Sequence, residues 1–317
     1  MSTVTDADLD LPEEAKEIID GLRQPQKSIS PKFFYDETGS RLFDEICRQP
    51  EYYPTRTELR IMEDNIDEIT DLIGSCASII EFGSGSSIKT RLLLDNLDRP
   101  AAYVPVDYSG EHLSQTAERL ASEFPDIEVL PVCADFTQPF DVPNPKNPTN
   151  NNVVFCPGST IGNFARTEAI DLMTVMRNEA GDRGKLLIGV DLEKPREIVE
   201  PAYNDAAGVT AEFNLNLLVH LNRDYGADFD VEAFEHEAVY DEDFKRIEMR
   251  LISLKKQEVR VAGTPIELDA DEFIVTEHSH KYSSERFSGL ARQAGFAPRR
   301  TWSDPKDLFS VQYLEAA

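Results

Sequence analysis

A glycine-rich turn between two acidic residues is the first feature of the sequence that could bind a ligand. The apolar run 77–82 contains Glu81 and is followed by Gly83 and Gly85. Glycine lets the backbone turn sharply and approach a ligand closely. The next apolar run ends in Asp107, where a carboxylate can reach the hydroxyls of a ribose. The pattern therefore predicts a nucleoside-type cofactor at this turn.

Two classes of cofactor use such a turn. The dinucleotide fingerprint requires a third glycine, and Ile88 stands in that position. Glu81 would repel a pyrophosphate, whereas S-adenosyl-L-methionine (SAM) has no phosphate and carries an ammonium that Glu81 could attract. Lys89 could meet the carboxylate of SAM, and Asp135 with Phe136 could hold its adenine. The residues favour SAM over NAD, and a glycine turn without a ligand is the alternative.

The elements that must position these residues alternate regularly between about 77 and 193. Alternating strands and helices are typical of a parallel sheet with helices on both faces. Continuous apolar runs fit strands that are buried on both sides, and ligands lie at the carboxyl ends of such strands. Strands are expected at 77–82, 101–107, 127–136, 151–159 and 184–192, and helices at 89–97, 111–124 and 166–178.

A different pattern surrounds this α/β region. From about 194 the sequence is largely helical, and from 231 to 281 it is strand-like. A helix over 283–296 and a strand over 308–316 then complete the chain. The Pro- and Asn-rich segment 139–152 is expected to be a surface connection rather than a boundary. We predict one domain from 57–193 and 282–317, and a second from 1–56 and 194–281.

Charge and composition exclude several classes of protein. The 317 residues include 59 acidic and 32 basic ones, for a net charge of -27. This charge disfavours nucleic acids and anionic membranes as partners. No 18-residue apolar stretch is present, and the polar, acidic N-terminus lacks the features of a secretory signal, so a cytoplasmic protein is expected. The four cysteines are far apart and form no metal motif, and Cys76, Cys133 and Cys156 are expected to be core residues.

Five longer motifs resemble the histidine-specific Nα-methyltransferases of ergothioneine biosynthesis. They are FFYDETGSRLFDEICRQPEYYPTRTE (33–58), EFGSGSSIKTRLLLD (81–95), GSTIGN (158–163), AYNDAAGVTAEFNLNLL (202–218) and TEHSHKY (276–282). The resemblance runs from about residue 27 to the C-terminus. It implies a class I SAM-methyltransferase fold, Rossmann-like, with an added α+β substrate-binding domain. It also implies trimethylation of the α-amine of L-histidine to hercynine, with S-adenosyl-L-homocysteine as the second product.

The resemblance also implies site residues, and it implies no metal. The resemblance and the glycine turn together give the residues expected to contact the cofactor. They are Tyr52, Glu81, Gly83, Gly85, Lys89, Asp107, Asp135 and Phe136. Histidine is expected to contact Tyr35, Phe43, Gly158, Asn163, Tyr203, Met249, Glu277 and Ser279. Tyr35, Asn163 and Tyr203 are the candidate catalytic residues.

Two residues in a strand-like run suggest how the imidazole ring of histidine would be recognised. Glu277 and Ser279 are two positions apart, so they share one face of a strand and could grip both imidazole nitrogens. His278 and His280 would face the other way. Methylation of another aromatic amino acid, such as a tryptophan derivative, and a non-catalytic SAM-binding module are the rival functions. An indole offers no basic nitrogen to a carboxylate, so Glu277 favours histidine. A monomer is expected.

Overall fold

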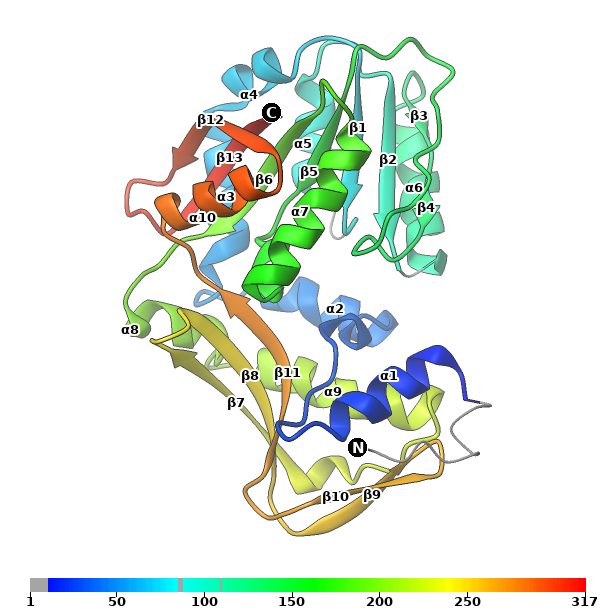
Figure 1. The fold of residues 1–317 in the computed structure, drawn as a ribbon, viewed down its shortest axis with the longest axis vertical. Helices are drawn as coiled ribbons and strands as arrows, with labels where there is room; N and C mark the ends of the chain where they lie inside the picture. Colours follow the sequence, from blue (N-terminus) through cyan, green and yellow to red (C-terminus); the bar gives the residue numbers. More distant parts are fainter. Residues whose placement is uncertain (1–10, 85–87, 109) are drawn as a thin grey trace. The chain divides into compact units, whose positions relative to one another are not determined.

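The computed structural model describes residues 11–84, 88–108 and 110–317 (Figure 1). The chain divides into two compact units. The large unit comprises Tyr53–Lys194 and His280–Ala317, and the small unit comprises Met1–Tyr52 and Pro195–Ser279. The domain bounds expected from the sequence, 57–193 with 282–317 and 1–56 with 194–281, stay a prediction. No helix in the described ranges is long and apolar enough to cross a membrane.

The large unit is built on an eight-stranded sheet with the order β12-β13-β6-β5-β1-β2-β3, in which β4 also pairs with β2. Strands β1 to β6 pair with one another in parallel. β13 is antiparallel to both β6 and β12. The predicted parallel sheet is therefore confirmed. The strands are β1 (Ala77–Phe82), β2 (Ala102–Asp107), β3 (Glu128–Val129), β4 (Val132–Cys133), β5 (Asn151–Cys156), β6 (Lys185–Asp191), β12 (Phe296–Ser303) and β13 (Phe309–Ala316).

Helices cover both faces of this sheet (Figure 1). Successive strand residues point to opposite faces, so Ile79 packs in one core cluster and Ile80 in another. The first cluster is completed by α3 (Tyr53–Asp64), α4 (Ile66–Ile73), α5 (Ile88–Asn96) and α6 (Gly110–Glu123). The second is completed by α7 (Arg166–Ala180) and α10 (Ser284–Gln293).

Two details of the sheet differ from the prediction. The single strand expected at 127–136 is split into β3 and β4 around Pro131, which has no N–H to donate to the ladder. Strand β12 was not predicted, because Pro298, Arg299 and Arg300 interrupt its apolar pattern. It lies at the end of the strand order, and its register shifts between Pro298 and Arg300. An edge position tolerates such residues.

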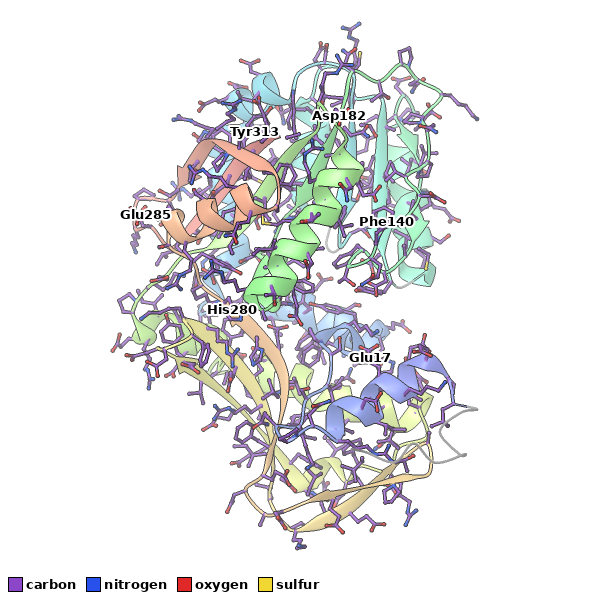
Figure 2. All side chains as sticks on the ribbon, in the orientation of Figure 1. Glu17, Phe140, Asp182, His280, Glu285 and Tyr313 are labelled. Atoms are coloured by element: carbon purple, nitrogen blue, oxygen red, sulfur yellow. The ribbon has the colours of Figure 1, made fainter. Side chains whose placement is uncertain are left out.

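The connection at 139–152 lies within the large unit and carries no helix or strand before β5 begins at Asn151. Phe140, labelled in Figure 2, packs its ring 5.6 Å from that of Phe82. The side chain of Asn147 donates to the carbonyl of Ala101 at 3.0 Å. The segment is therefore an attached surface connection, as predicted.

The small unit combines helices with short antiparallel strands. Its two sheets have the orders β11-β8-β7 and β10-β9, and α9 packs against α2 and β7. Its helices are α1 (Glu13–Leu22), α2 (Glu37–Ile46), α8 (Arg196–Val199) and α9 (Val209–Asp224), with 3-10 turns η2 (Pro31–Phe34), η4 (Glu200–Ala202) and η5 (Val231–Ala233). Its strands are β7 (Phe234–Asp241), β8 (Arg246–Ser253), β9 (Gln257–Val261), β10 (Thr264–Leu268) and β11 (Phe273–His280), which ends in the large unit.

Candidate functional site

The glycine turn after β1 brings its backbone to the acidic end of β2. Gly83 has a φ of +80°, a conformation that L side chains rarely adopt, and its N–H donates to the carbonyl of Val106 at 2.9 Å. The N–H of Ser84 donates to Asp107 Oδ2 at 3.1 Å. The predicted neighbours Gly83 and Asp107 are thus held together at the carboxyl edge of the sheet. Gly85 lies outside the described residues.

The segment after β4 places Asp135 and Phe136 near the same edge. The hydroxyl of Tyr108, the residue after β2, donates to Asp135 Oδ1 at 2.8 Å, and the N–H of Thr137 donates to the same oxygen at 2.8 Å. The ring of Phe136 is buried, 5.1 Å from Tyr108 and 5.7 Å from Phe82. Asp135 is therefore fixed by the end of β2, and the sequence analysis missed Tyr108 as its partner.

Lys89 is paired with a carboxylate that the sequence analysis did not single out. Lys89 Nζ lies 2.5 Å from Glu58 Oε2, and the N–H of Gly158 donates to the same oxygen at 2.8 Å. Glu58 comes from α3 and is fully buried. A Cβ on Gly189 would lie 2.2 Å from Glu58 Oε1, so only glycine fits there. Glu58 therefore bridges two predicted site residues, Lys89 and Gly158.

Glu81 is buried under the glycine turn and already has partners. Its carboxylate accepts hydrogen bonds from Thr90 Oγ1, at 2.8 and 2.9 Å, and from the hydroxyl of Tyr103. Burial raises the pKa of Glu81 to about 7, although the bonds from Tyr103 and Thr90 act to lower it. Its predicted attraction for a cofactor ammonium stays a prediction.

A second buried carboxylate lies at the end of β6. Asp191 accepts hydrogen bonds from the hydroxyl of Tyr53 at 2.9 Å and from Lys194 Nζ at 2.6 Å, and it lies 2.8 Å from Lys281 Nζ. Its own N–H donates to Ser159 Oγ at 2.9 Å. Burial acts to raise the pKa of Asp191, but the two lysines hold it below its usual range. The side chains of Asp191, Lys194 and Lys281 are at most 3% exposed.

In the small unit, the predicted substrate residues gather around a buried tyrosine. The hydroxyl of Tyr203 lies 2.8 Å from Ser279 Oγ, and both residues are buried. The ring of Tyr52 lies 6.1 Å from that of Tyr203 and 6.2 Å from that of Phe43. Burial, followed by the charges of Tyr203 and other neighbours including Glu277, raises the pKa of Tyr52. Tyr52 thus lies beside two predicted substrate residues of its own unit, and its contact with the cofactor stays a prediction.

The same group of aromatic rings includes Tyr35 and also Phe213, which the sequence analysis did not single out. The ring of Tyr35 lies 5.9 Å from Phe43 and 6.0 Å from Phe213 on α9. The next residue, Asp36, caps α2 by accepting from the N–H of Gly39 at 2.7 Å. A Cβ on Gly39 would lie 1.7 Å from the carbonyl oxygen of Phe34. The glycine is therefore required for this turn, which presents Tyr35.

Asp36 also ties the Tyr35 turn to α9. Its Oδ1 accepts from Asn216 Nδ2 at 2.9 Å, and its Oδ2 accepts from Arg223 Nη1 at 2.9 Å. Burial would raise the pKa of Asp36, but hydrogen bonds from Gly39, Asn216 and Arg223 bring it below its usual range. The carboxylate is therefore charged wherever the protein is folded near neutral pH.

The remaining predicted residues are distributed between the units. Met249 is buried in β8, and Glu277 is half-buried in β11. His278 points elsewhere, with Nε2 3.4 Å from Glu248 Oε1. In the large unit, Asn163 ends the 3-10 turn η3 (Thr160–Asn163), which follows β5. Within the described ranges, no group of three or more His, Cys, Asp or Glu side chains is arranged to hold a metal.

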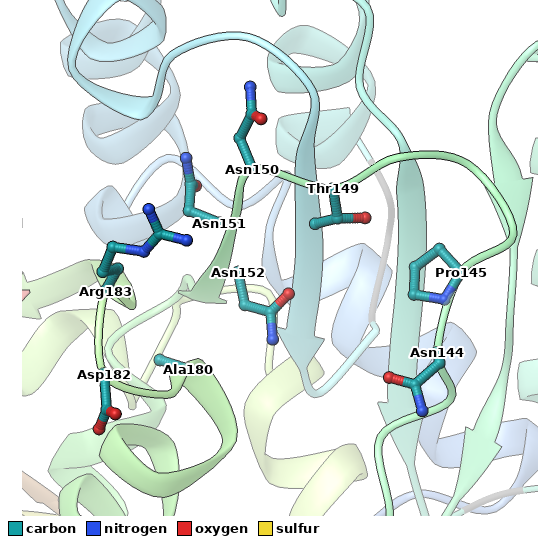
Figure 3. Close-up of a pocket in the computed structure, with 9 residues that line it drawn as sticks. All are labelled: Asn144, Pro145, Thr149, Asn150, Asn151, Asn152, Ala180, Asp182 and Arg183. Carbon is teal, nitrogen blue, oxygen red and sulfur yellow. The ribbon is translucent and has the colours of Figure 1, made fainter.

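A surface pocket in the large unit is unrelated to these residues (Figure 3). It lies where β5 begins, whereas the candidate cofactor residues lie where the parallel strands end. Two of its lining side chains serve the fold, because Asn150 donates to the carbonyl of Ser75 and Asn152 to that of Glu179. The lining residues are Asn144, Pro145, Thr149, Asn150, Asn151, Asn152, Ala180, Asp182 and Arg183.

The parallel sheet, its glycine turn and the carboxylates at successive strand ends define a class I SAM-dependent methyltransferase. The family of histidine-specific, SAM-dependent methyltransferases matches residues 14–316, and the chain belongs to this family. The predicted family and fold class are therefore confirmed.

Curated relatives agree with the family. The chain is 39% identical to the histidine N-alpha-methyltransferase of Mycolicibacterium smegmatis, over 92% of this chain and 91% of that protein. It is 37% identical to the Mycobacterium tuberculosis protein of the same name, over 93% and 92%. Ergothioneine biosynthesis protein 1 of Neurospora crassa is 32% identical over 90% of this chain and 32% of its own length. A solved SAM-dependent methyltransferase from Clostridium acetobutylicum aligns with a TM-score of 0.48 at 11% identity, covering 81% of this chain and 92% of its own.

Proposed function

We propose that this chain transfers methyl groups from SAM to the α-amine of L-histidine, three times in succession, to give hercynine for ergothioneine biosynthesis. The family match over residues 14–316 supports this reaction. The observation that carries it is the buried Tyr203–Ser279 pair, with Glu277 on the same strand as Ser279. A hydroxyl and a carboxylate so placed suit a polar ring with two nitrogens.

The large unit is proposed to bind SAM, and its donors and acceptors fit that molecule. The carboxylate of Asp107 suits the ribose hydroxyls, and the carboxylate of Asp135 suits the adenine amine. Lys89, held by Glu58, suits the SAM carboxylate. When bound, SAM supplies a methyl group on a positively charged sulfur. Glu81, Gly83, Gly85 and Phe136 complete the proposed cofactor set of this unit, and the contact of Tyr52 with the cofactor stays a prediction.

The small unit is proposed to orient histidine. Asn163 of the large unit and Tyr203 are assigned to its carboxylate, and Glu277 and Ser279 to its imidazole. Tyr35, Phe43 and Met249 would provide apolar walls, with Gly158 allowing close approach. Transfer needs a neutral amine in line with the methyl carbon and the sulfur, so the protein's main task is alignment. Tyr35 is the candidate route for the departing proton. The monomeric state and cytoplasmic location expected from the sequence stay predictions.

The experiment that tests this function replaces Glu277 with alanine and compares L-histidine with L-tryptophan. Histidine kcat/KM should fall at least about tenfold, because a charged hydrogen bond to the imidazole is lost. Tryptophan kcat/KM should hold steady or rise, since an indole offers no basic nitrogen to the Glu277 carboxylate. Product masses report how many methyl groups were added.

A matched control uses Glu258, an exposed glutamate on β9 of the same unit. Glu258→Ala should leave both substrates unaffected. Equal losses for histidine and tryptophan in Glu277→Ala would mean that Glu277 supports the fold rather than recognising imidazole. Failure of the wild-type protein to methylate histidine in the presence of SAM would refute the proposed function.

A further inference from the structure

His236 belongs to a partly buried hydrogen-bond network in the small unit and has no role of its own in the proposed reaction. Its Nδ1 lies 2.8 Å from Asn214 Nδ2, and its Nε2 lies 2.9 Å from the carbonyl oxygen of Tyr203. Asn214, on α9, is fully buried. The network therefore ends on the backbone of a proposed catalytic residue.

The chemistry of the partners determines which way each group points. A backbone carbonyl can only accept, so Asn214 Nδ2, 3.0 Å from the carbonyl of Arg250, must be the amide nitrogen. The Asn214 Oδ1 then accepts from Thr276 Oγ1 at 2.8 Å, as an amide oxygen should. Because Asn214 donates to His236 Nδ1, this nitrogen carries no proton. His236 Nε2 must carry one, because it faces the carbonyl of Tyr203.

These bonds form a closed circuit with the proposed substrate residues. Asn214 holds Thr276 on β11, and Ser279 lies three residues further along the same strand. Ser279 bonds to the hydroxyl of Tyr203, whose carbonyl returns to His236 and thus to Asn214. Both ends of Tyr203, its side-chain hydroxyl and its main-chain carbonyl, are thereby fixed by one network.

We propose that His236 is a positioning residue for histidine methylation, which acts as a neutral imidazole with its proton on Nε2 and holds Tyr203 in place for the substrate. This assignment rests on the proposed function. His236 touches neither substrate in this scheme; it acts through Tyr203. An imidazolium would bring a second proton, on Nδ1, against the amide nitrogen of Asn214 and break the circuit.

The surroundings of His236 support the neutral form. Burial lowers the pKa of the imidazole, although the bond to the Tyr203 carbonyl and the charges of Asp205 and Glu237 act to raise it. Glu237 is itself 3.4 Å from Arg250 Nη1, a positive group that faces it from β8. The neutral state required by the geometry is therefore also the state favoured by burial near neutral pH.

The test compares two substitutions of His236 that differ in whether the new side chain can donate a hydrogen bond to the Tyr203 carbonyl. In His236→Gln, the side-chain amide can still donate to the Tyr203 carbonyl; in His236→Leu, no donor remains. The leucine variant should raise the KM for histidine at least about tenfold, because a misplaced Tyr203 weakens every bond that depends on it. Its dissociation constant for S-adenosylhomocysteine should stay within about twofold of the wild-type value, and the glutamine variant should recover most of the histidine KM.

A matched control removes a different imidazole from the same unit. His220 lies on α9, and its Nδ1 is 2.7 Å from the carbonyl oxygen of Phe33. His220→Leu should lower thermal stability without the selective rise in histidine KM. A wild-type KM in His236→Leu, a parallel rise in both constants, or a glutamine variant as impaired as leucine would overturn the positioning role.

A measurement without substrate keeps the inference separate from the proposed function and from any folding defect of a variant. Nitrogen-15 NMR of the wild-type imidazole at pH 8 should show His236 protonated on Nε2 and unprotonated on Nδ1. The opposite tautomer or an imidazolium would overturn the assignment. If the tautomer is as expected but the wild-type protein leaves histidine unmethylated, the proposed function fails while the arrangement around His236 stands.

Discussion

The two units hold their candidate site residues by different physical means. In the large unit, buried carboxylates form ion pairs with lysines: Glu58 pairs with Lys89, and Asp191 pairs with Lys194 and Lys281. Around Tyr203 in the small unit, neutral hydrogen bonds hold the residues, as in the pair Tyr203–Ser279 and the network of His236. The turn that carries Tyr35, by contrast, is held by the charged pair Asp36–Arg223. Buried ions are expensive to transfer from water and depend on their partners, whereas neutral hydrogen bonds each contribute modestly.

This difference suits the ligands proposed for each unit. A charged cofactor such as SAM can be matched by fixed charges already compensated within the protein, as Lys89 is by Glu58. Histidine must be bound with a neutral amine, and strong fixed charges nearby would shift the amine's protonation. The hydrogen bonds that hold Tyr203 itself, from Ser279 and His236, add no charge of their own. The comparison predicts larger and more pH-dependent effects of substitution in the large unit.

The largest effect is expected at Asp191. Asp191→Asn removes the negative charge that pairs with the two buried ammonium groups of Lys194 and Lys281, so stability should fall by about 3–5 kcal/mol. Urea unfolding of the purified protein measures this loss. Tyr53→Phe is the control, since it deletes one neutral donor to the same carboxylate and should cost about 1 kcal/mol. Equal losses in the two variants would show that charge does not dominate here.

A smaller, pH-dependent effect is expected at Glu81. Its pKa rises from 4.5 to about 7 in the folded state, so its contribution to stability is full below pH 4.5 and is lost as the pH rises through 7. Glu81→Gln stays uncharged and lacks this dependence. Between pH 4.5 and 8 the variant should therefore gain on the order of 3 kcal/mol of stability relative to wild type.

Unfolding titrations at several pH values measure that gain. Wild type and Glu81→Gln are compared at each pH, so that all other titrating groups cancel. Glu123, an exposed glutamate of the same unit, provides the control substitution Glu123→Gln. Parallel stability curves for wild type and Glu81→Gln from pH 4.5 to 8 would mean that the carboxyl of Glu81 is ionised throughout.

The sequence predicts the large unit well because its physical signals are local. Continuous apolar runs reveal the parallel strands, and Gly83, Asp107 and Asp135 mark the strand ends where a ligand would bind. Exceptions arise where one residue breaks a run, as Pro131 does between β3 and β4. Pro298 similarly obscures β12.

The partners of the site residues escaped prediction because they are distant in sequence. Glu58 lies 31 positions from Lys89, and nothing in the sequence marks it as a buried glutamate among many solvated ones. Asn214 and His236 come from a helix and a strand whose packing no periodicity reveals. Motifs can thus identify residues that meet a ligand, whereas the groups that hold those residues appear only with the tertiary structure.

The smallest effect on stability is expected at Ser279. Ser279→Ala deletes one neutral hydroxyl that bonds to Tyr203, so stability should fall by about 0.5–1.5 kcal/mol. The loss should be constant from pH 7 to 8.5, because the serine hydroxyl that is deleted does not titrate. The KM for histidine should still rise roughly three- to tenfold, because Tyr203 and the substrate each lose a hydrogen-bond partner.

Ser310 provides the matched control from the large unit. It is a fully buried serine on β13 whose Oγ accepts from Gln312 Nε2 at 3.2 Å. Ser310→Ala should cost a similar amount of stability, because the same atom and a comparable bond are removed, and it should leave the histidine KM unchanged. A loss in Ser279→Ala as large as that in Asp191→Asn, or one that changes steeply over this pH range, would contradict the neutral character assigned to the hydrogen bonds around Tyr203. Equal KM values in the two serine variants would instead remove Ser279 from the substrate set while leaving the contrast between the units intact.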